Sequence, residues 1–293
     1  MLDPRRLRLL IALESLGTVR AVAVAASMSP SAVSQQLAAL ERESGTALLE
    51  RHGRAVALTD AGVALAAHAR AILERIGAAE EDLRALRDAP AGTVRIASFT
   101  SAMRAFVITA AATAGREYPG IAVHLSELEP DDCVPALTRG EVDLAVVADF
   151  GDGSLPHTRN LRSVRLATDE LKAVLPPGHA AFTGRLGDLA EDPWVLDGTE
   201  LERHVLRRCR RAGFEPHVVA RLVSHEALLY AVHSGLGVTI LPTFALDRAD
   251  GVEVRPLEPV ARRELMVLHR EDALDRRSVA LTLDVLVAAA RGA

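Results

Sequence analysis

Apolar residues recur at helical spacing near the start of the chain and predict three short helices. The first begins at Asp3 or Pro4 and ends at Gly17. Its apolar face consists of Leu7, Leu10, Ile11 and Leu13. The second covers residues 18–26 and is made mostly of Ala and Val. Residues this small allow two helices to approach closely, as a helix-turn-helix requires.

The third predicted helix runs from Ser29 to Gly45 and has two different faces. Ser29 is a good N-cap, and Pro30 suits the first helical position because its missing N–H would be unpaired there anyway. The apolar stripe consists of Val33, Leu37 and Leu40, and the polar face of Ser31, Ser34 and Gln35. Short uncharged donors and acceptors suit base edges or phosphates in a DNA major groove. Taken alone, this segment fits an ordinary helical hairpin equally well.

An extended stretch at residues 48–58 is interrupted by Gly53 and predicts a β-hairpin. Arg51 and Arg54 flank its turn. Arginines on a hairpin are usually only solvated charge. Because these two follow directly after a candidate recognition helix, we expect them to reach DNA phosphate or the minor groove.

A single long helix is predicted over residues 60–88, capped by Thr59 and free of proline. Apolar residues recur every seven positions in two interleaved sets, which is typical of a coiled-coil seam. The seam supplies the candidate dimerisation residues Leu65, Ala69, Ile72, Ile76, Leu83 and Leu86. Charged residues such as Arg70 and Glu74 take the outward positions. A dimerisation helix and a helix packed on the body of the protein both fit this pattern, and the first is favoured.

Strands and helices alternate after the break at Ala89-Pro90-Ala91-Gly92. Predicted strands lie at 93–98, 121–125, 142–147, 170–175, 194–196, 217–222, 238–241 and 263–269. Predicted helices lie at 102–118, 131–139, 200–211, 224–234 and 277–290. The first three of these strands, with the helices between them, predict βαβ units with a parallel sheet and right-handed crossovers. Two α/β lobes joined by crossing strands would leave a ligand cleft at the carboxyl ends of the strands.

Composition limits the function classes. Residues 1–58 contain seven arginines and five acidic residues, whereas the whole 293-residue chain has a net charge of −5. A small DNA-binding domain on an acidic body fits this distribution. With no signal-peptide h-region at the start and no apolar run of about 20 residues, we expect a cytoplasmic protein without membrane contact. Cys133 and Cys209 form no CxxC pair; inert buried thiols are favoured over a redox pair.

These motifs together resemble those of the LysR-type transcriptional regulators. The N-terminal match consists of residues 29–37 with Leu40-Glu41 and Gly45, then Leu49-Glu50-Arg51 and residues 58–62. The C-terminal match consists of Gly140-Glu141-Val142-Asp143 and residues 234–242. The resemblance implies an α/β protein with an N-terminal all-α winged helix-turn-helix, a long linker helix and a two-lobed effector domain similar to type 2 periplasmic binding proteins. It also implies a homodimer or homotetramer that binds and bends promoter DNA, responds to a small-molecule effector and contacts RNA polymerase.

The resemblance also divides the chain. Residues 1–59 would form the DNA-binding domain, 60–89 the dimerisation helix and 92–293 the effector-binding domain. In the effector domain, the first lobe would cover about 92–161 and 265–293, and the second about 162–264. The positions that face DNA in this family fall on Ser29, Pro30, Ser31, Ser34 and Gln35, with Arg51 and Arg54 in the wing. Ala26 replaces a larger aliphatic residue of many members, which loosens the expected packing between the two helices.

The effector site is expected where Phe99-Thr100-Ser101 matches the family's ligand-contacting turn. Hydroxyls and backbone N–H groups at a helix start favour an anionic group, although Thr100 or Ser101 can equally cap its own helix. Further cleft candidates are Asp149, Phe150, Thr199, Ser224 and His225. Pro130 stands where some members have a second hydroxyl contact, so their effectors cannot be assumed here.

Two other function classes compete with a regulator. An enzyme is disfavoured because the chain has no GxSxG elbow, Walker loop or complete GxGxxG, and its histidines show no metal-ligand spacing. We therefore expect no catalytic residues, metal or cofactor. A solute-binding protein for transport is disfavoured by the missing export signal and by the helix-turn-helix pattern.

Overall fold

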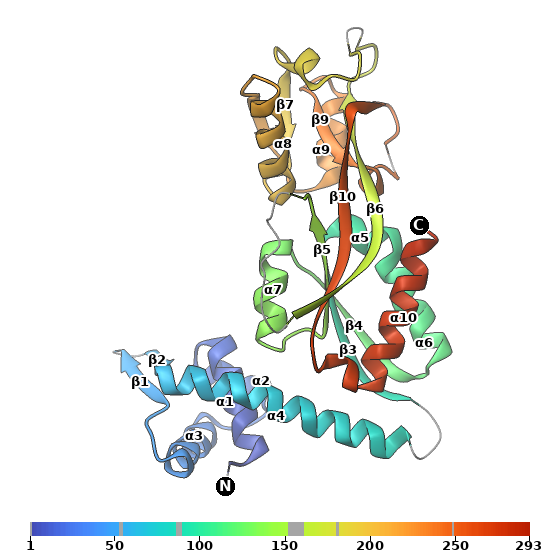
Figure 1. Cartoon of the computed structure of the whole chain (residues 1–293). Helices are drawn as coiled ribbons and strands as arrows, with labels where there is room; N and C mark the ends of the chain where they lie inside the picture. Colours follow the sequence, from blue (N-terminus) through green and yellow to red (C-terminus); the bar gives the residue numbers. More distant parts are fainter. Residues whose placement is uncertain (1, 53–54, 86–89, 152–160, 180–181, 248) are drawn as a thin grey trace. The chain divides into compact units, whose positions relative to one another are not determined.

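The computed structural model describes residues 2–52, 55–85, 90–151, 161–179, 182–247 and 249–293. Arg54 and Leu86 therefore lie outside the described residues. The chain divides into two compact units, residues 1–83 and 84–293, and each is described by itself. Figure 1 labels their helices and strands.

The first unit contains three short helices, a two-stranded hairpin and one long helix. They are α1 (Pro4–Leu16), α2 (Val19–Ala25), α3 (Pro30–Ser44), β1 (Leu49–His52), β2 (Ala55–Leu58) and α4 (Asp60–Ala85). The antiparallel hairpin pairs Leu49 with Leu58. Each of these elements was predicted, and their ends follow from local chemistry, as the caps of α3 illustrate.

The caps of α3 confirm the predicted ends of this helix. Ser29 Oγ accepts a hydrogen bond from the backbone N–H of Ala32 at 3.2 Å. Gly45 ends the helix in the left-handed conformation, with φ of 71°, which favours glycine. Val33, Leu37 and Leu40 are fully buried in the core of this unit, as expected. On α1, Leu9 is buried together with Leu7, whereas Ile11 is only partly buried.

The N-terminal half of α4 packs on this same core, which changes the expected role of two residues. Ala66 and Ala69 have no exposed surface and belong to the core of the first unit. Arg70, expected to point outward, is buried and forms an ion pair with Glu14 of α1. The heptad pattern did not reveal this because small residues in a coiled-coil seam can equally pack against their own domain.

The second unit is built on a six-stranded mixed sheet with the order β4-β3-β5-β10-β6-β9. Its strands are β3 (Ala91–Ser98), β4 (Gly120–Glu127), β5 (Leu144–Asp149), β6 (Leu161–Leu175), β9 (Thr239–Pro242) and β10 (Glu253–Arg270). A smaller parallel sheet pairs β7 (Pro193–Leu196) with β8 (His217–Arg221). The helices are α5 (Thr100–Ala102), α6 (Ile108–Glu117), α7 (Pro130–Thr138), α8 (Glu200–Arg211), α9 (His225–His233) and α10 (Arg277–Arg291).

The predicted parallel pairing is confirmed for the first three strands, but the sheet as a whole is mixed. β3 is parallel to β4 and β5, but β10 is antiparallel to both β5 and β6, and β6 is antiparallel to β9. The reason is that β6 and β10 are long strands of 15 and 18 residues that run side by side through both lobes in opposite directions (Figure 1). The two strands were predicted only as 170–175 and 263–269.

Separate cores define the two lobes. The core of the first lobe contains residues of β3, β5, α6 and α10, with a satellite cluster beneath α7. The core of the second lobe contains residues of β7, β9, α8 and α9. Cys133 lies in the satellite cluster and Cys209 in the second core, and burial raises the pKa of each thiol to about 12. The two buried thiols therefore lie in different cores and remain protonated at neutral pH.

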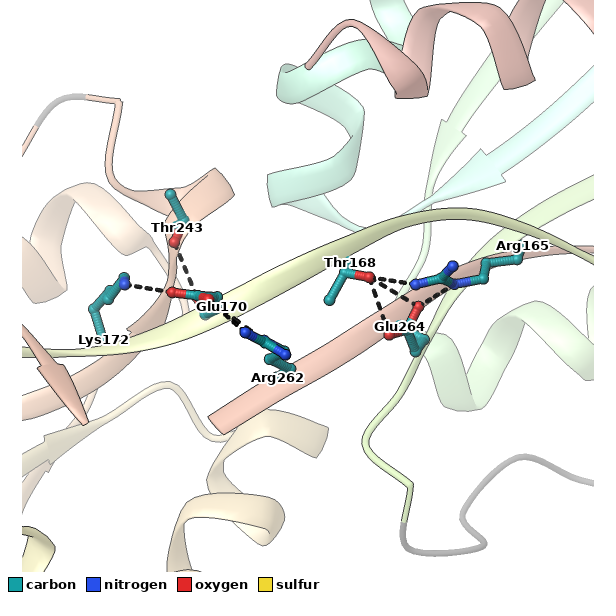
Figure 2. Close-up of polar contacts among 7 residues, drawn as sticks. All are labelled: Arg165, Thr168, Glu170, Lys172, Thr243, Arg262 and Glu264. Atoms are coloured by element: carbon teal, nitrogen blue, oxygen red, sulfur yellow. Dashed lines mark hydrogen bonds and ion pairs between the residues drawn. The ribbon is translucent and has the colours of Figure 1, made fainter. Parts of the chain in front are cut away.

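Two groups of polar side chains lie along β6 and β10, where these paired strands pass from one lobe to the other (Figure 2). Glu170 accepts hydrogen bonds from Lys172 Nζ at 2.6 Å and from Arg262 Nη2 at 3.2 Å. Nearby, Glu264 of β10 pairs with Arg165 and Thr168 of β6. The contacts of Arg262 and Glu264 join β10 to β6 in addition to the backbone hydrogen bonds, whereas the Lys172–Glu170 contact lies within β6.

Candidate functional site

The first candidate site is the exposed face at the start of α3. Ser29, Pro30, Ser31, Ser34 and Gln35 are all exposed, while the opposite stripe of the same helix is buried. The hydroxyls of Ser29 and Ser31 lie 3.0 Å apart. This face presents neutral donors and acceptors to solvent, which is the chemistry that base edges require.

Glu41, which the sequence marked only as part of the family resemblance, attaches the hairpin to α3. Glu41 Oε1 accepts hydrogen bonds from the backbone N–H groups of Leu48 at 3.0 Å and Leu49 at 3.1 Å. The position of the hairpin thus depends on the last turns of α3. Arg51 lies on β1, opposite Val56, but neither its side chain nor Arg54 belongs to the described part of the structure.

The heptad residues of α4 do not share one environment. Ile72 and Leu83 are exposed by 39% and 65%, respectively. Leu65 is half-buried against the core of its own unit, and Ile76 is half-buried as well. Ala69 is fully buried in that core, so it is not available to a second helix, contrary to the expectation.

The second candidate site is a pocket between the lobes of the second unit, with about 460 Å³ of space free of protein atoms. Five of the expected effector residues line it, namely Thr100, Ser101, Phe150, Thr199 and His225. Asp149 and Ser224 do not line it, because each stabilises a turn of the backbone instead. Asp149 Oδ1 accepts from the N–H of Gly151 at 2.8 Å, and Ser224 caps α9.

Thr100 and Ser101 do not cap their own helix. The N-cap position belongs to Phe99, which makes no side-chain cap hydrogen bond. Thr100 Oγ1 instead donates to Glu127, and Ser101 Oγ accepts from Arg263 Nη2 at 2.8 Å. The helix itself begins at Thr100, earlier than predicted, and contains a π turn at Met103–Val107 before it continues as α6. Such turns are frequent at functional sites.

A buried ion pair forms one wall of the pocket and was missed in the sequence. Arg263 of β10 donates to Asp169 of β6 through Nε at 3.0 Å and Nη2 at 2.7 Å. The two residues are exposed by only 4% and 1%. The Arg263 guanidinium also lies 5.0 Å from the centre of the Phe99 ring. No motif marks this pair, because its members are 94 positions apart in the sequence.

Three carboxylates also line the pocket, among several apolar side chains. Glu129, directly before α7, and Asp197 and Glu200, at the start of α8, all face it. Burial, and then the negative charge of Asp197, raise the pKa of Glu129. Burial lowers the pKa of His225, so its ring is neutral at pH 7. The sequence predicted none of these three carboxylates and named Asp149 as an acidic cleft residue instead, which does not line the pocket.

Within the described ranges, no group of three or more His, Cys, Asp or Glu side chains is arranged to hold a metal ion. The described helices also include none with the length and apolar character needed to cross a membrane.

Comparison with known proteins identifies both units. The family model "LysR substrate binding domain" matches residues 87–291, and "Bacterial regulatory helix-turn-helix protein, lysR family" matches residues 4–63. The transcriptional dual regulator GltC of Bacillus subtilis is 31% identical over 223 residues, which are 73% of this chain and 73% of that protein.

Solved structures show the same fold. A variant of full-length OxyR from Pseudomonas aeruginosa has a TM-score of 0.74 at 23% identity, covering 98% of this chain and 95% of that one. Full-length CbnR in complex with its target DNA has a TM-score of 0.63 at 22% identity, covering 98% and 100%. The chain belongs to the LysR family, and it is a transcriptional regulator, not an enzyme, with a DNA-binding helix-turn-helix and an effector-binding domain.

Proposed function

We propose that this regulator reads promoter DNA with the exposed face of α3, formed by Ser29, Pro30, Ser31, Ser34 and Gln35. The observation that carries the proposal is the exposure of this whole face while Val33, Leu37 and Leu40 anchor the helix from behind. Arg51 and Arg54 of the hairpin supply contacts to phosphate or the minor groove. We assign this role to residues 1–59.

In the same proposal, residues 60–89 join two chains and residues 92–293 bind the effector in the pocket between the lobes. Dimerisation uses Leu65, Ile72, Ile76, Leu83 and Leu86, of which Ile72 and Leu83 have the largest exposure among the described ones. Two dimers form a tetramer. The assembly acts in the cytoplasm and contacts RNA polymerase when bound at a promoter.

For the effector, we propose an anionic group close to Thr100 and Ser101. Arg263 Nη2 donates to Ser101 Oγ at 2.8 Å, so the Ser101 hydroxyl can in turn donate its own hydrogen to an anionic oxygen. Phe150 and His225 line the same pocket and complete the contact surface.

The test of the DNA-reading role is Gln35→Ala, because Gln35 is exposed and lies on the polar face of α3. Loss of a base contact costs about 1–3 kcal/mol, so we expect specific binding to fall roughly ten- to hundredfold. Binding to the protein's own promoter region is measured by fluorescence anisotropy at fixed salt, since salt changes affinity strongly.

The matched control is Gln36→Ala. Gln36 is the neighbouring residue of the same type, but its Oε1 accepts a hydrogen bond from Arg6 Nε of α1 at 2.9 Å. It should retain DNA affinity. Equal binding by the Gln35 variant and the parent protein would remove Gln35 from the DNA-reading face, and absence of any sequence preference in the parent would overturn the proposed function.

A further inference from the structure

The pocket between the lobes has an excess of negative charge on its walls. Glu129, Asp197 and Glu200 line it, and Asp197 and Glu200 are exposed by only 5% and 9%. Arg263 is the one arginine among the described lining residues, and the fully buried Asp169 balances its charge. A ligand that carries only negative charge would therefore be repelled by carboxylates on two sides of the pocket.

The carboxylate of Asp197 is held by neutral donors. Its oxygens accept from the N–H of Thr199 at 3.0 Å, the hydroxyl of Thr199 at 2.6 Å and the N–H of Glu202 at 3.2 Å. These bonds orient the carboxylate, but their donors are neutral and carry no positive charge to balance it. Among the described residues, neither Asp197 nor Glu129 forms an ion pair with Lys, Arg or His.

The two sides of the pocket come from different lobes. Glu129 precedes α7, whose buried residues belong to a core cluster of the first lobe. Asp197 and Glu200 lie at the start of α8, which packs in the core of the second lobe. A positive group between them would attract both lobes at once, so it would favour a closed arrangement of the two lobes.

We infer that the effector carries a cationic nitrogen group, an ammonium or a guanidinium, that lies between Glu129, Asp197 and Glu200. The inference rests on the proposed function, which makes this pocket the effector site. With the anionic group proposed beside Ser101, the ligand class is a small zwitterion such as an amino acid.

The raised pKa of Glu129 agrees with this arrangement. It results first from burial and then from the charges of Asp197, Glu127, Asp132 and Glu200. A bound cation would remove this repulsion, whereas a bound anion would add to it.

The experiment measures thermal unfolding of the full-length protein with probes in three charge classes. The zwitterions are the twenty common amino acids, and the amines are isobutylamine, phenethylamine, cadaverine and agmatine. The acids without a cationic nitrogen are 3-methylbutanoate, 3-phenylpropanoate and glutarate. We expect saturable increases in melting temperature only with nitrogen-bearing cations. A shift produced only by the acids, or no shift with any amine or amino acid, would overturn the inference.

Two variants locate the effect in the pocket. Glu129→Gln should weaken binding of the active probe about tenfold or more, because one charge-assisted contact is lost. Glu117→Gln, an exposed glutamate on α6, should leave the affinity unchanged. Unchanged affinity in the Glu129 variant would also contradict the inference.

DNA binding by the same preparations separates this inference from the proposed function. If the parent protein binds its promoter region specifically but responds only to acids, the inference alone fails. If specific DNA binding is absent, the proposed function fails regardless of the ligand class.

Discussion

Arg262 and Arg263 are neighbours on β10, yet their side chains lie in different environments. Arg262 is exposed and pairs with Glu170 on the surface (Figure 2). Arg263 is buried and pairs with buried Asp169. Alternation along a strand explains the difference, because successive side chains point to opposite faces of the sheet. The sequence could not show which arginine turns inward, since that depends on the partner strand β6.

Replacing Arg263 by Ala should destabilise the protein strongly, because Asp169 would be left as an unpaired buried charge. The expected loss is about 3–5 kcal/mol in the free energy of unfolding. Arg262→Ala is the control and should change it little, since exposed ion pairs contribute little. Urea unfolding of both variants provides the measurement, and similar losses would contradict the assigned difference in burial.

Glu129→Gln should stabilise the ligand-free protein near neutral pH. The folded protein raises the pKa of Glu129 above its ordinary 4.5, so it binds this proton more tightly than the unfolded chain does. The resulting penalty is absent at pH values well below the ordinary pKa and grows as the pH rises through the raised pKa.

The expected result is a melting temperature a few degrees above that of the parent at about pH 7, with the difference vanishing towards about pH 4. Melting curves across this range, with Glu117→Gln as the control, test the sign. A Glu129→Gln variant that is less stable than the parent protein at neutral pH would show that burial and neighbouring negative charges do not destabilise the Glu129 carboxylate.

At the scale of elements, local chemistry made the short helices of the first unit predictable, whereas the long strands of the second were not. The ends of α3 depend on Ser29, Pro30 and Gly45, which are adjacent to the helix in the sequence. β6 carries charged side chains such as Arg162 and Arg165 that pair with residues roughly a hundred positions away. Their partners are known only once the chain is folded. The strands predicted from the sequence pattern were therefore shorter than β6 and β10 are in the structure.

The first turn of α4 depends on a glycine. A Cβ atom at Gly62 would lie 2.2 Å from the carbonyl oxygen of Leu48, where the hairpin begins. Gly62→Ala should therefore cost about 1–3 kcal/mol of stability through overpacking.

Gly77, later in the same helix, has no atom within 4 Å of the corresponding position. Gly77→Ala should raise stability by about 1 kcal/mol, as expected for a helix interior. Thermal melting of the two variants gives opposite shifts if this packing is right; a neutral Gly62 variant would contradict it.

For the whole molecule, the sequence predicted the order of the domains but not the charge of the pocket. The positions of Thr100, Ser101, Phe150, Thr199 and His225 were expected from the resemblance, whereas Glu129, Asp197 and Arg263 were not. The first group lies at predicted strand or helix ends, whereas nothing in the local pattern showed which charged side chains turn into the pocket. The heptad pattern in α4 had a similar limit, because it did not show that Ala69 packs in its own unit.

Formation of the oligomer should depend on the apolar heptad residues of α4 that do not pack in the core of their own unit. Ile72→Asp combined with Ile76→Asp is expected to disrupt the dimer, because it places charges in an apolar seam. Sedimentation velocity measures the oligomer, and Ala67→Asp with Ala71→Asp, two exposed positions outside the seam, is the control. An unchanged oligomer in the first variant would show that α4 does not hold the chains together.

Lys172, at the crossing of β6 and β10, is the only lysine in the chain. Apart from the terminal amine, an amine-reactive dye therefore has one target, and that target contacts Glu170 beside the strands that connect the lobes. Acylation would remove the positive charge and with it the ion pair. Once the terminal amine has been blocked, a single fluorophore can thus be attached to β6 where this strand runs along the second lobe.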